Sequence, residues 1–298
     1  MISVTLGFIV TKSIIIDLSA VSRKHLPAVT CSVLVATYNR PDVLKRCLKS
    51  LFRQSRLPDQ IIVCDDGSGP ETRQAIQQLQ TESPVPLIHV WQADEGFKLA
   101  QIRNKGIAMA TSSYLIQIDG DVILHRHFVR DQLNIAKPGV FYSGNQFHLT
   151  QQETQQLLTG SLASLPLILK QSRLTWHRMW VPFLQKPTAR LYHWKDHYLY
   201  VSGCNMAFWR EDLLAVNGYD ESFTGWGWED TDLTFRLMNL GRRLRFIRFG
   251  AIQYHLYHPP SSRRDQESNR QRALANRDAH VIYCQSGLAK YLPDTISR

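Results

Sequence analysis

The sequence predicts an α/β fold in which helices flank a mostly parallel sheet. Three apolar stretches with strand character begin near residues 60, 87 and 114, about 27 residues apart, and helical patterns separate them. Strand–helix–strand units of that length build parallel sheets with right-handed crossovers. The composition, 44% hydrophobic and 20% charged over 298 residues, is that of a globular protein with a sizeable core.

The first half of the chain supplies these repeating units. Residues 32–37 are expected to form a buried strand, and Pro41 then stands at the first position of a helix, where its missing N–H does no harm. Apolar side chains recur at helical spacing as far as Phe52. The later units comprise strands 61–64, 87–91 and 114–118 and helices 71–79 and 99–110.

The second half is less regular. Residues 149–196 break the pattern with a helical stretch at 151–165 and scattered aromatics, which either line an acceptor site or pack in an ordinary way. The remaining predicted elements are strands at 198–209, 244–249 and 254–258, a helix from 230 to a stop at Gly241, a polar loop at 261–271 and a last helix at 272–291.

Charge and cysteine usage limit the partners and the compartment. The formal net charge of +10 favours anionic partners, but no run of Lys and Arg interleaved with aromatics indicates nucleic acid. The five cysteines include no C-x-x-C pair, which argues against a disulfide framework or a zinc site and fits a reducing compartment.

The N-terminal stretch predicts no membrane span. Lys12 and Asp17 interrupt the apolar residues of 2–18, which fall short of the ~20 that a span needs. We therefore expect a cytoplasmic protein. Peripheral association with the inner face of a membrane is compatible with this expectation.

Polar residues follow three of the predicted strands at their carboxyl ends. They are 37–40, 65–68 and 119–121, and in a parallel sheet they would lie along one edge, where ligands bind. The sequence has no G-x-G-x-x-G after the first strand and no G-x-x-x-x-G-K-[ST]. This argues against a dinucleotide enzyme and a P-loop nucleotidase.

The triplet Asp119-Gly120-Asp121 is the central chemical signal. Two carboxylates at a strand end can hold Mg²⁺ or Mn²⁺ against a diphosphate, although a lone D-x-D is more often a solvated turn. His255 or His258 would supply a third ligand.

Two further acidic pairs have alternative explanations. Asp65-Asp66 is either a turn or a contact to the imide N–H of a uracil. Glu229-Asp230 either stabilises the start of a helix or, beside Trp226-Gly227-Trp228, provides a general base next to a sugar that stacks on an indole.

Together these motifs resemble the family 2 glycosyltransferases of GT-A fold. The resemblance rests on 36–40, 65–68, 119–121 and 226–230, and residues 201–208 with the W-G-W-E-D segment resemble the galactosyl- and N-acetylgalactosaminyltransferase branch. That branch includes bacterial chondroitin-polymerase domains and, more distantly, β-1,4-galactosyltransferases.

The resemblance implies an inverting transfer of a hexose or N-acetylhexosamine, with Gal or GalNAc favoured, from a UDP-sugar. The acceptor would be a hydroxyl of a glycan or lipid-linked glycan in surface polysaccharide or lipopolysaccharide synthesis, and the cofactor Mn²⁺ or Mg²⁺. The implied roles are the catalytic base for Asp230, metal ligation for Asp121, Asp119 and His255, and donor binding for Thr37, Tyr38, Arg40, Asp66, Arg103, Asn104, Asp119, Gly203, Trp226 and Glu229.

On this basis we divide the chain into an N-terminal extension (1–30), a GT-A domain (31–258) and a C-terminal loop and helix (259–298). The domain comprises a nucleotide-binding half (31–148), a helical insertion (149–196) and an acceptor and catalytic half (197–258). The helical insertion has no counterpart among the motifs of that family, so the resemblance does not identify the acceptor. The alternatives are a sugar nucleotidyltransferase and a non-catalytic carbohydrate-binding protein of the same fold.

Overall fold

A seven-stranded, mostly parallel sheet forms the centre of the molecule, as the sequence predicts. The computed structural model describes residues 29–160, 179–191, 197–201, 203–259 and 263–293, so the expected extension and much of the insertion lie outside the described residues. The strand order is β3-β2-β1-β4-β8-β6-β9, and β8 runs antiparallel to both its neighbours. The strands are β1 (Cys31–Thr37), β2 (Gln60–Asp65), β3 (Leu87–Trp91), β4 (Tyr114–Asp119), β6 (Val140–Gly144), β8 (Asn205–Trp209) and β9 (Arg243–Ile247).

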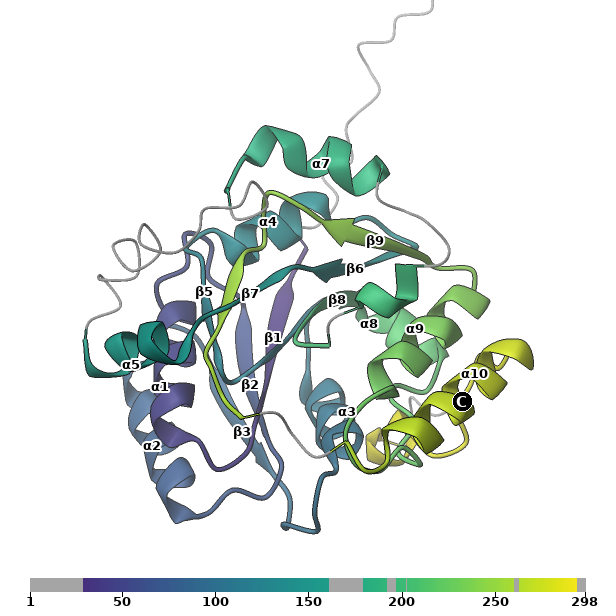
Figure 1. Cartoon of the computed structure of the whole chain (residues 1–298), viewed down its shortest axis with the longest axis horizontal. Coiled ribbons are helices and arrows are strands. Elements are labelled where there is room, and N and C mark those ends of the chain that lie inside the picture. Colours follow the sequence, from purple (N-terminus) through teal and green to yellow (C-terminus); the bar gives the residue numbers. More distant parts are fainter. Residues whose placement is uncertain (1–28, 161–178, 192–196, 202, 260–262, 294–298) are drawn as a thin grey trace, which may run out of the picture.

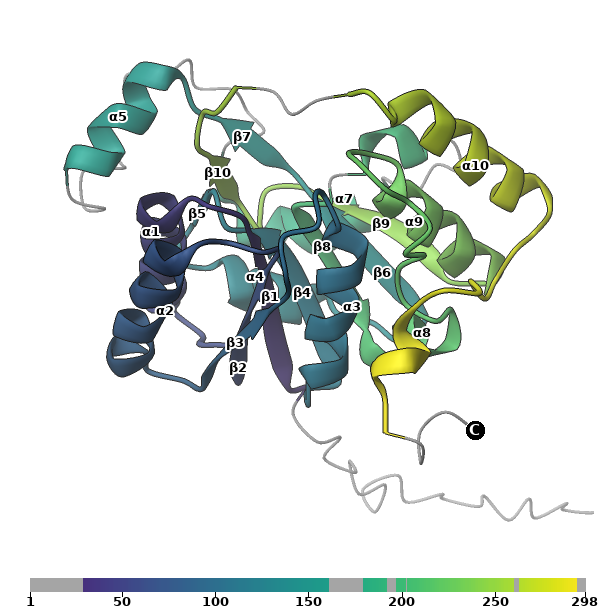
Figure 2. The ribbon, with the colours of Figure 1, turned by 90° about the horizontal axis from the view of Figure 1, so that it is seen from below.

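Helices cover both faces of this sheet (Figures 1 and 2). One apolar core lies between the sheet and α1 (Pro41–Leu51), α2 (Pro70–Glu82) and α4 (Phe128–Ile135). The other lies between the sheet and α3 (Leu99–Met109), α8 (Arg210–Ala215) and α9 (Glu229–Asn239). The central strands are therefore buried on both faces, which explains why they are continuous apolar runs.

A small three-stranded sheet crosses one end of the central sheet. It consists of β5 (Val122–Leu124), β10 (Gln253–His255) and β7 (Gln146–His148). In its register His255 lies opposite Val122, and the amide of Leu256 donates to the carbonyl of Asp121 at 2.9 Å. This pairing brings the end of β10 beside the Asp119-Gly120-Asp121 turn.

The remaining helices lie around this framework. They are α5 (Gln151–Thr159), α7 (Pro182–Leu191), α10 (Gln266–Asp278) and two 3₁₀ turns, η4 (His197–Tyr200) and η5 (Leu288–Tyr291). A capping box between Thr150 and Glu153 begins α5. No helix among the described ranges is both long and apolar enough to span a membrane.

The boundaries of two predicted elements differ clearly from the structure. The last helix begins at Gln266 rather than 272 and ends at Asp278, because Asn269 and Ala273 pack under the W-G-W-E-D loop and His280 takes a left-handed conformation. The predicted strand at 198–209 is strand only from Asn205, since the residues before it include the η4 turn.

Candidate active site

The three polar turns meet at one edge of the sheet, as predicted, because β2, β1 and β4 are neighbours. The amide of Asp66 donates to the carbonyl of Thr37 at 3.0 Å, and the amide of Gly120 donates to the carbonyl of Ala36 at 2.6 Å. These bonds place Thr37, Asp66 and Asp119 side by side at the carboxyl ends of their strands.

Asp66 is a buried carboxylate held by the loop after β3. Its Oδ1 accepts from Gln92 Nε2 at 2.5 Å and its Oδ2 accepts from the amide of Lys98 at 2.9 Å. Burial raises the pKa of Asp66 above its usual range. Tyr38, by contrast, is half exposed, and its hydroxyl donates to Asp94. Asp66 therefore sits as a fixed acceptor beside an accessible aromatic ring.

A metal-binding arrangement forms where β10 meets the triplet. One ligand atom each from Asp121, His255 and His258 lies within 4.8 Å of the others. Asp121 Oδ1 is buried and has no hydrogen-bond partner among the described residues, and His255 Nε2 is 3.5 Å away. Burial lowers the pKa of His255, which favours the neutral imidazole that binds metals. The residues present thus fit a divalent cation, and His258 joins the set beside the predicted His255.

Arg40 also contacts this cluster. Its guanidinium donates to Asp121 Oδ2 at 2.9 Å. This oxygen lies 3.3 Å from His258 Nε2, so the arginine supplies positive charge next to the metal-binding arrangement.

Arg103 connects the triplet with the start of α9. Its guanidinium lies 3.2 Å from Asp119, 2.9 Å from Asp230 and 3.4 Å from Glu229, and its side chain is almost fully buried. Burial alone would lower the pKa of Arg103, but the carboxylates, Asp230 foremost, outweigh it and raise the pKa well above its ordinary value. One cation therefore joins Asp119 to the consecutive carboxylates of Glu229 and Asp230, which lie in a distant part of the sequence.

Two of the carboxylates around Arg103, those of Glu229 and Asp119, have raised pKa values. Burial raises the pKa of Glu229 to about 8, with the charge of Asp230 adding to the effect. Burial likewise raises the pKa of Asp119 to about 6. Glu229 Oε2 is buried and has no hydrogen-bond partner of ordinary geometry in the described parts of the chain.

Asp230 is oriented so that its two oxygens have different surroundings. Oδ1 accepts from Arg103, from the Tyr219 hydroxyl at 2.8 Å and from Gln117 Nε2 at 3.3 Å. Oδ2 faces Gly203, where any side chain would collide with it. The backbone of Trp228, left-handed at φ 75°, begins α9 directly before this acidic pair. Gly203, which is predicted to bind the donor, is thus a position where the close approach of Asp230 leaves no room for a side chain.

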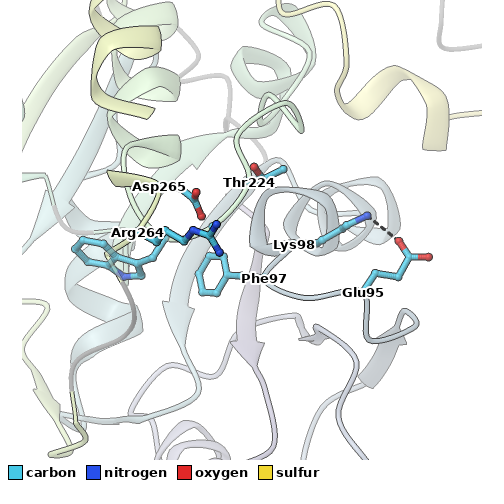
Figure 3. A pocket seen from close by; sticks show the side chains of 8 residues that line it. Glu95, Phe97, Lys98, Thr224, Arg264 and Asp265 are labelled. Atoms are coloured by element: carbon cyan, nitrogen blue, oxygen red, sulfur yellow. Dashed lines mark hydrogen bonds and ion pairs between the residues drawn. The ribbon is translucent and has the colours of Figure 1, made fainter. Parts of the chain in front are cut away.

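A cavity of about 310 Å³ lies beside the W-G-W-E-D loop. Phe97 and Trp226 line it together with Lys98, Arg264 and Asp265 (Figure 3). Arg263 lies over the Trp226 ring at 5.5 Å. Two aromatic walls with polar groups between them suit a sugar ring, which presents an apolar face and hydroxyl edges.

The structure gives Asn104 a different position from the one expected of a donor-binding residue. Its side chain is fully buried, and its amide bonds the backbone of Tyr219 twice and Glu221 once. These bonds use both N–H groups, so Asn104 holds the turn at Tyr219 rather than facing the open edge of the sheet.

Tyr219 and Gln117 are site residues that the sequence analysis missed. Tyr219 lies between the predicted strand at 198–209 and the predicted helix from 230, where no site residue is expected. Gln117 carried the clearer signal, because it is a polar residue in the middle of an otherwise apolar strand.

Family comparisons agree with this geometry. Residues 32–213 match the family described as Glycosyl transferase family 2, and residues 186–259 match the one described as N-terminal domain of galactosyltransferase. The first match covers more than half of the chain, so the chain belongs to glycosyl transferase family 2, a family of enzymes. The predicted family and enzyme class are confirmed.

Similar proteins extend the comparison. Chondroitin synthase from Escherichia coli is 27% identical over 267 residues, which cover 84% of this chain but only 38% of that relative. S. aureus TarS 1–349 in complex with UDP has a TM-score of 0.58 at 14% identity, over 90% of this chain and 69% of that one. The mannosyltransferase PcManGT from Pyrobaculum calidifontis, in complex with GDP-Man and Mn²⁺, has a TM-score of 0.57 at 18% identity, over 85% of this chain and 64% of that one. The structural similarity confirms the predicted GT-A fold.

Proposed function

We propose that the chain transfers a hexose or N-acetylhexosamine from a UDP-sugar to a hydroxyl of a glycan or lipid-linked acceptor, with inversion. The observation that carries this proposal is the Arg103 bridge, which holds Asp119 at the nucleotide edge and Asp230 at the start of α9 on one guanidinium. A donor bound along the edge would therefore have its reacting end next to the carboxylate of Asp230.

The chemistry is a single displacement. Asp230 Oδ2 accepts the proton of the acceptor hydroxyl, the oxygen forms a bond to the anomeric carbon, and the bond from that carbon to UDP breaks. Glu229, which is protonated at neutral pH given its raised pKa, donates a hydrogen bond to a sugar hydroxyl. Trp226 and Phe97 hold a sugar ring in the adjacent cavity.

Asp121, His255 and His258 would hold a divalent cation. When bound, it neutralises the negative charge that grows on the departing diphosphate. Two imidazole ligands disfavour Mg²⁺, which takes oxygen ligands, and suit a transition-metal ion, for which we propose Mn²⁺. Mn²⁺ in the similar mannosyltransferase supports this choice, and UDP in the TarS complex supports the nucleotide.

The chondroitin synthase relative and the galactosyltransferase match support a Gal-type or GalNAc-type donor in surface polysaccharide synthesis. We further propose that the chain works in the cytoplasm with its acceptor at a membrane surface, in keeping with its net positive charge. Family membership favours sugar transfer over the nucleotidyltransferase alternative.

The test is turnover of UDP-Gal, UDP-GalNAc, UDP-Glc, UDP-GlcNAc and GDP-Man over a panel of glycan acceptors, with Mn²⁺, Mg²⁺ or chelator. We expect Mn²⁺-dependent release of UDP from one UDP-sugar and a product of inverted anomeric configuration. Asp230→Asn should abolish transfer and keep UDP affinity, while the exposed Asp278→Asn serves as a matched control. Transfer by Asp230→Asn at the wild-type rate, or full activity in chelator, would refute the mechanism.

A further inference from the structure

The two carboxylate oxygens of the proposed base have different surroundings. Asp230 Oδ1 receives all three of the hydrogen bonds described above, whereas Oδ2 faces the backbone of Gly203. Rotation of the carboxylate would exchange the two oxygens. A group that fixes Oδ1 therefore decides which oxygen meets the acceptor.

The Tyr219 hydroxyl is placed to do this. Its oxygen lies 2.8 Å from Asp230 Oδ1 and 2.8 Å from Gln117 Oε1. The hydroxyl has one proton, and the charged carboxylate is the stronger acceptor, so the proton points to Asp230. The ring is fully buried and lies 5.3 Å below the guanidinium carbon of Arg103, which prevents it from swinging away.

Hydrogen bonds also fix the backbone of Tyr219. The Asn104 side chain accepts from the amide of Tyr219 and donates to its carbonyl, both at 2.8 Å. Gly218 takes φ 65°, and a side chain there would strike Asn104. The turn therefore has little freedom to move its tyrosine relative to α3.

The last described segment of the chain makes hydrogen bonds and an ion pair with the same turn. The amides of Leu288 and Ala289 donate to Asn217, at 2.8 Å to its carbonyl and 2.6 Å to its Oδ1. Lys290 Nζ lies 2.5 Å from Glu221, and the Tyr291 hydroxyl donates to Glu221 at 3.1 Å. We call residues 284–291 the C-terminal clasp.

We propose that Tyr219 is a positioning residue for Asp230 and that the C-terminal clasp holds Tyr219 in place. This inference rests on the proposed role of Asp230 as the base. It gives the segment after α10 a part in catalysis, although none of its residues contacts the carboxylates of the site in the described structure.

The first test is Tyr219→Phe, which removes the hydroxyl and keeps the ring. Loss of a hydrogen bond to a charged group should lower kcat by about 10- to 100-fold. The affinity for UDP and the KM for the donor should change by less than about twofold. Tyr142→Phe is the matched control, because Tyr142 is a buried tyrosine whose hydroxyl donates to the carbonyl of Ile135, outside the site.

The second test addresses the clasp with a variant that should fold. Lys290 is about half exposed, so Lys290→Met removes the contact to Glu221 at the surface. We expect kcat to fall several-fold with UDP affinity unchanged. In Tyr219→Phe the additional loss from Lys290→Met should vanish, because both changes act through the same hydroxyl.

The outcomes separate the two proposals. If Asp230→Asn is inactive while Tyr219→Phe has wild-type kcat, the positioning role is refuted and the base stands. A parallel fall of kcat and UDP affinity in Tyr219→Phe would also refute it, as would equal losses in Tyr219→Phe and Tyr142→Phe. Full transfer activity in Asp230→Asn would refute the proposed role of Asp230 as the base, on which both proposals rest.

Discussion

The buried Glu229 should make the stability of the protein fall as the pH rises, and Glu229→Gln should remove that dependence. The pKa of Glu229 in the folded chain is about 8, against an ordinary value of 4.5. Between these values the folded state keeps a proton that the unfolded state has lost, so folding is favoured at low pH. This stabilisation is complete below about pH 4.5 and is lost as the pH rises through about 8.

The magnitude follows from the size of this shift. One proton gives a slope of about 1.4 kcal/mol per pH unit, and the whole interval corresponds to about 5 kcal/mol in the free energy of unfolding as an upper limit. Glutamine has nearly the same shape and never ionises. The difference in stability between the variant and the wild type should therefore shift in favour of the variant as the pH rises.

The measurement is urea unfolding at pH 5.5, 7 and 8.5, followed by tryptophan fluorescence without donor or metal. Every other titrating group is present in both proteins, so the difference between them reports the titration of Glu229 together with the carboxylate of Asp230 beside it. Glu267→Gln is the control, because it changes an exposed glutamate on α10. Its free energy of unfolding should depend on pH in the same way as that of the wild type over this range. A constant difference between Glu229→Gln and the wild type from pH 5.5 to 8.5 would refute the reasoning.

Three further substitutions test the other contacts. Arg103→Met should lower the free energy of unfolding by about 3–5 kcal/mol, because it leaves buried carboxylates without their cation; an unchanged urea midpoint would contradict this. Gly203→Ala should reduce transfer at least about 100-fold by displacing Asp230, which assays of UDP release would detect; active Gly203→Ala protein would rule out the close contact. His258→Ala should weaken Mn²⁺ binding at least about tenfold, measured by electron paramagnetic resonance of free Mn²⁺; wild-type affinity would leave His258 outside the ligand set.

The strands and the edge they form were predictable because local patterns determine them. Apolar runs of strand length recur at even intervals, and the parallel arrangement then places Thr37, Asp66 and Asp119 together. Local patterns do not predict the strands of the 122–148 region, since β5, β6 and β7 are short and take their partners from distant parts of the chain.

The connections between the two halves of the site could not be read from any local pattern. Arg103 is a basic residue on a helix, and only the packing of α3 against α9 shows that it is buried among carboxylates. Tyr219 likewise depends on the docking of a turn that is itself held by residues 288–291. Such contacts join distant segments of the chain: Asn104 and Tyr219, for example, are 115 residues apart.

The charge balance of the site leads to a last prediction, which concerns the order in which ligands can bind. Four carboxylates, on Asp119, Asp121, Glu229 and Asp230, contact the two guanidinium groups of Arg40 and Arg103. Even with Glu229 protonated, the negative charges outnumber these two positive charges. A diphosphate adds more negative charge, so tight binding of UDP needs a further cation at Asp121.

Mn²⁺ and UDP should therefore strengthen each other's binding, by the same factor in both directions. We expect at least about a tenfold effect, or about 1.4 kcal/mol of coupling, in calorimetric titrations of UDP with and without Mn²⁺. Uridine has no phosphate and serves as the control, since its affinity should not respond to the metal. Equal UDP affinity with Mn²⁺ and with chelator would show that Arg40 and Arg103 alone meet the charge of the diphosphate, and that the cluster at Asp121 does not serve the donor.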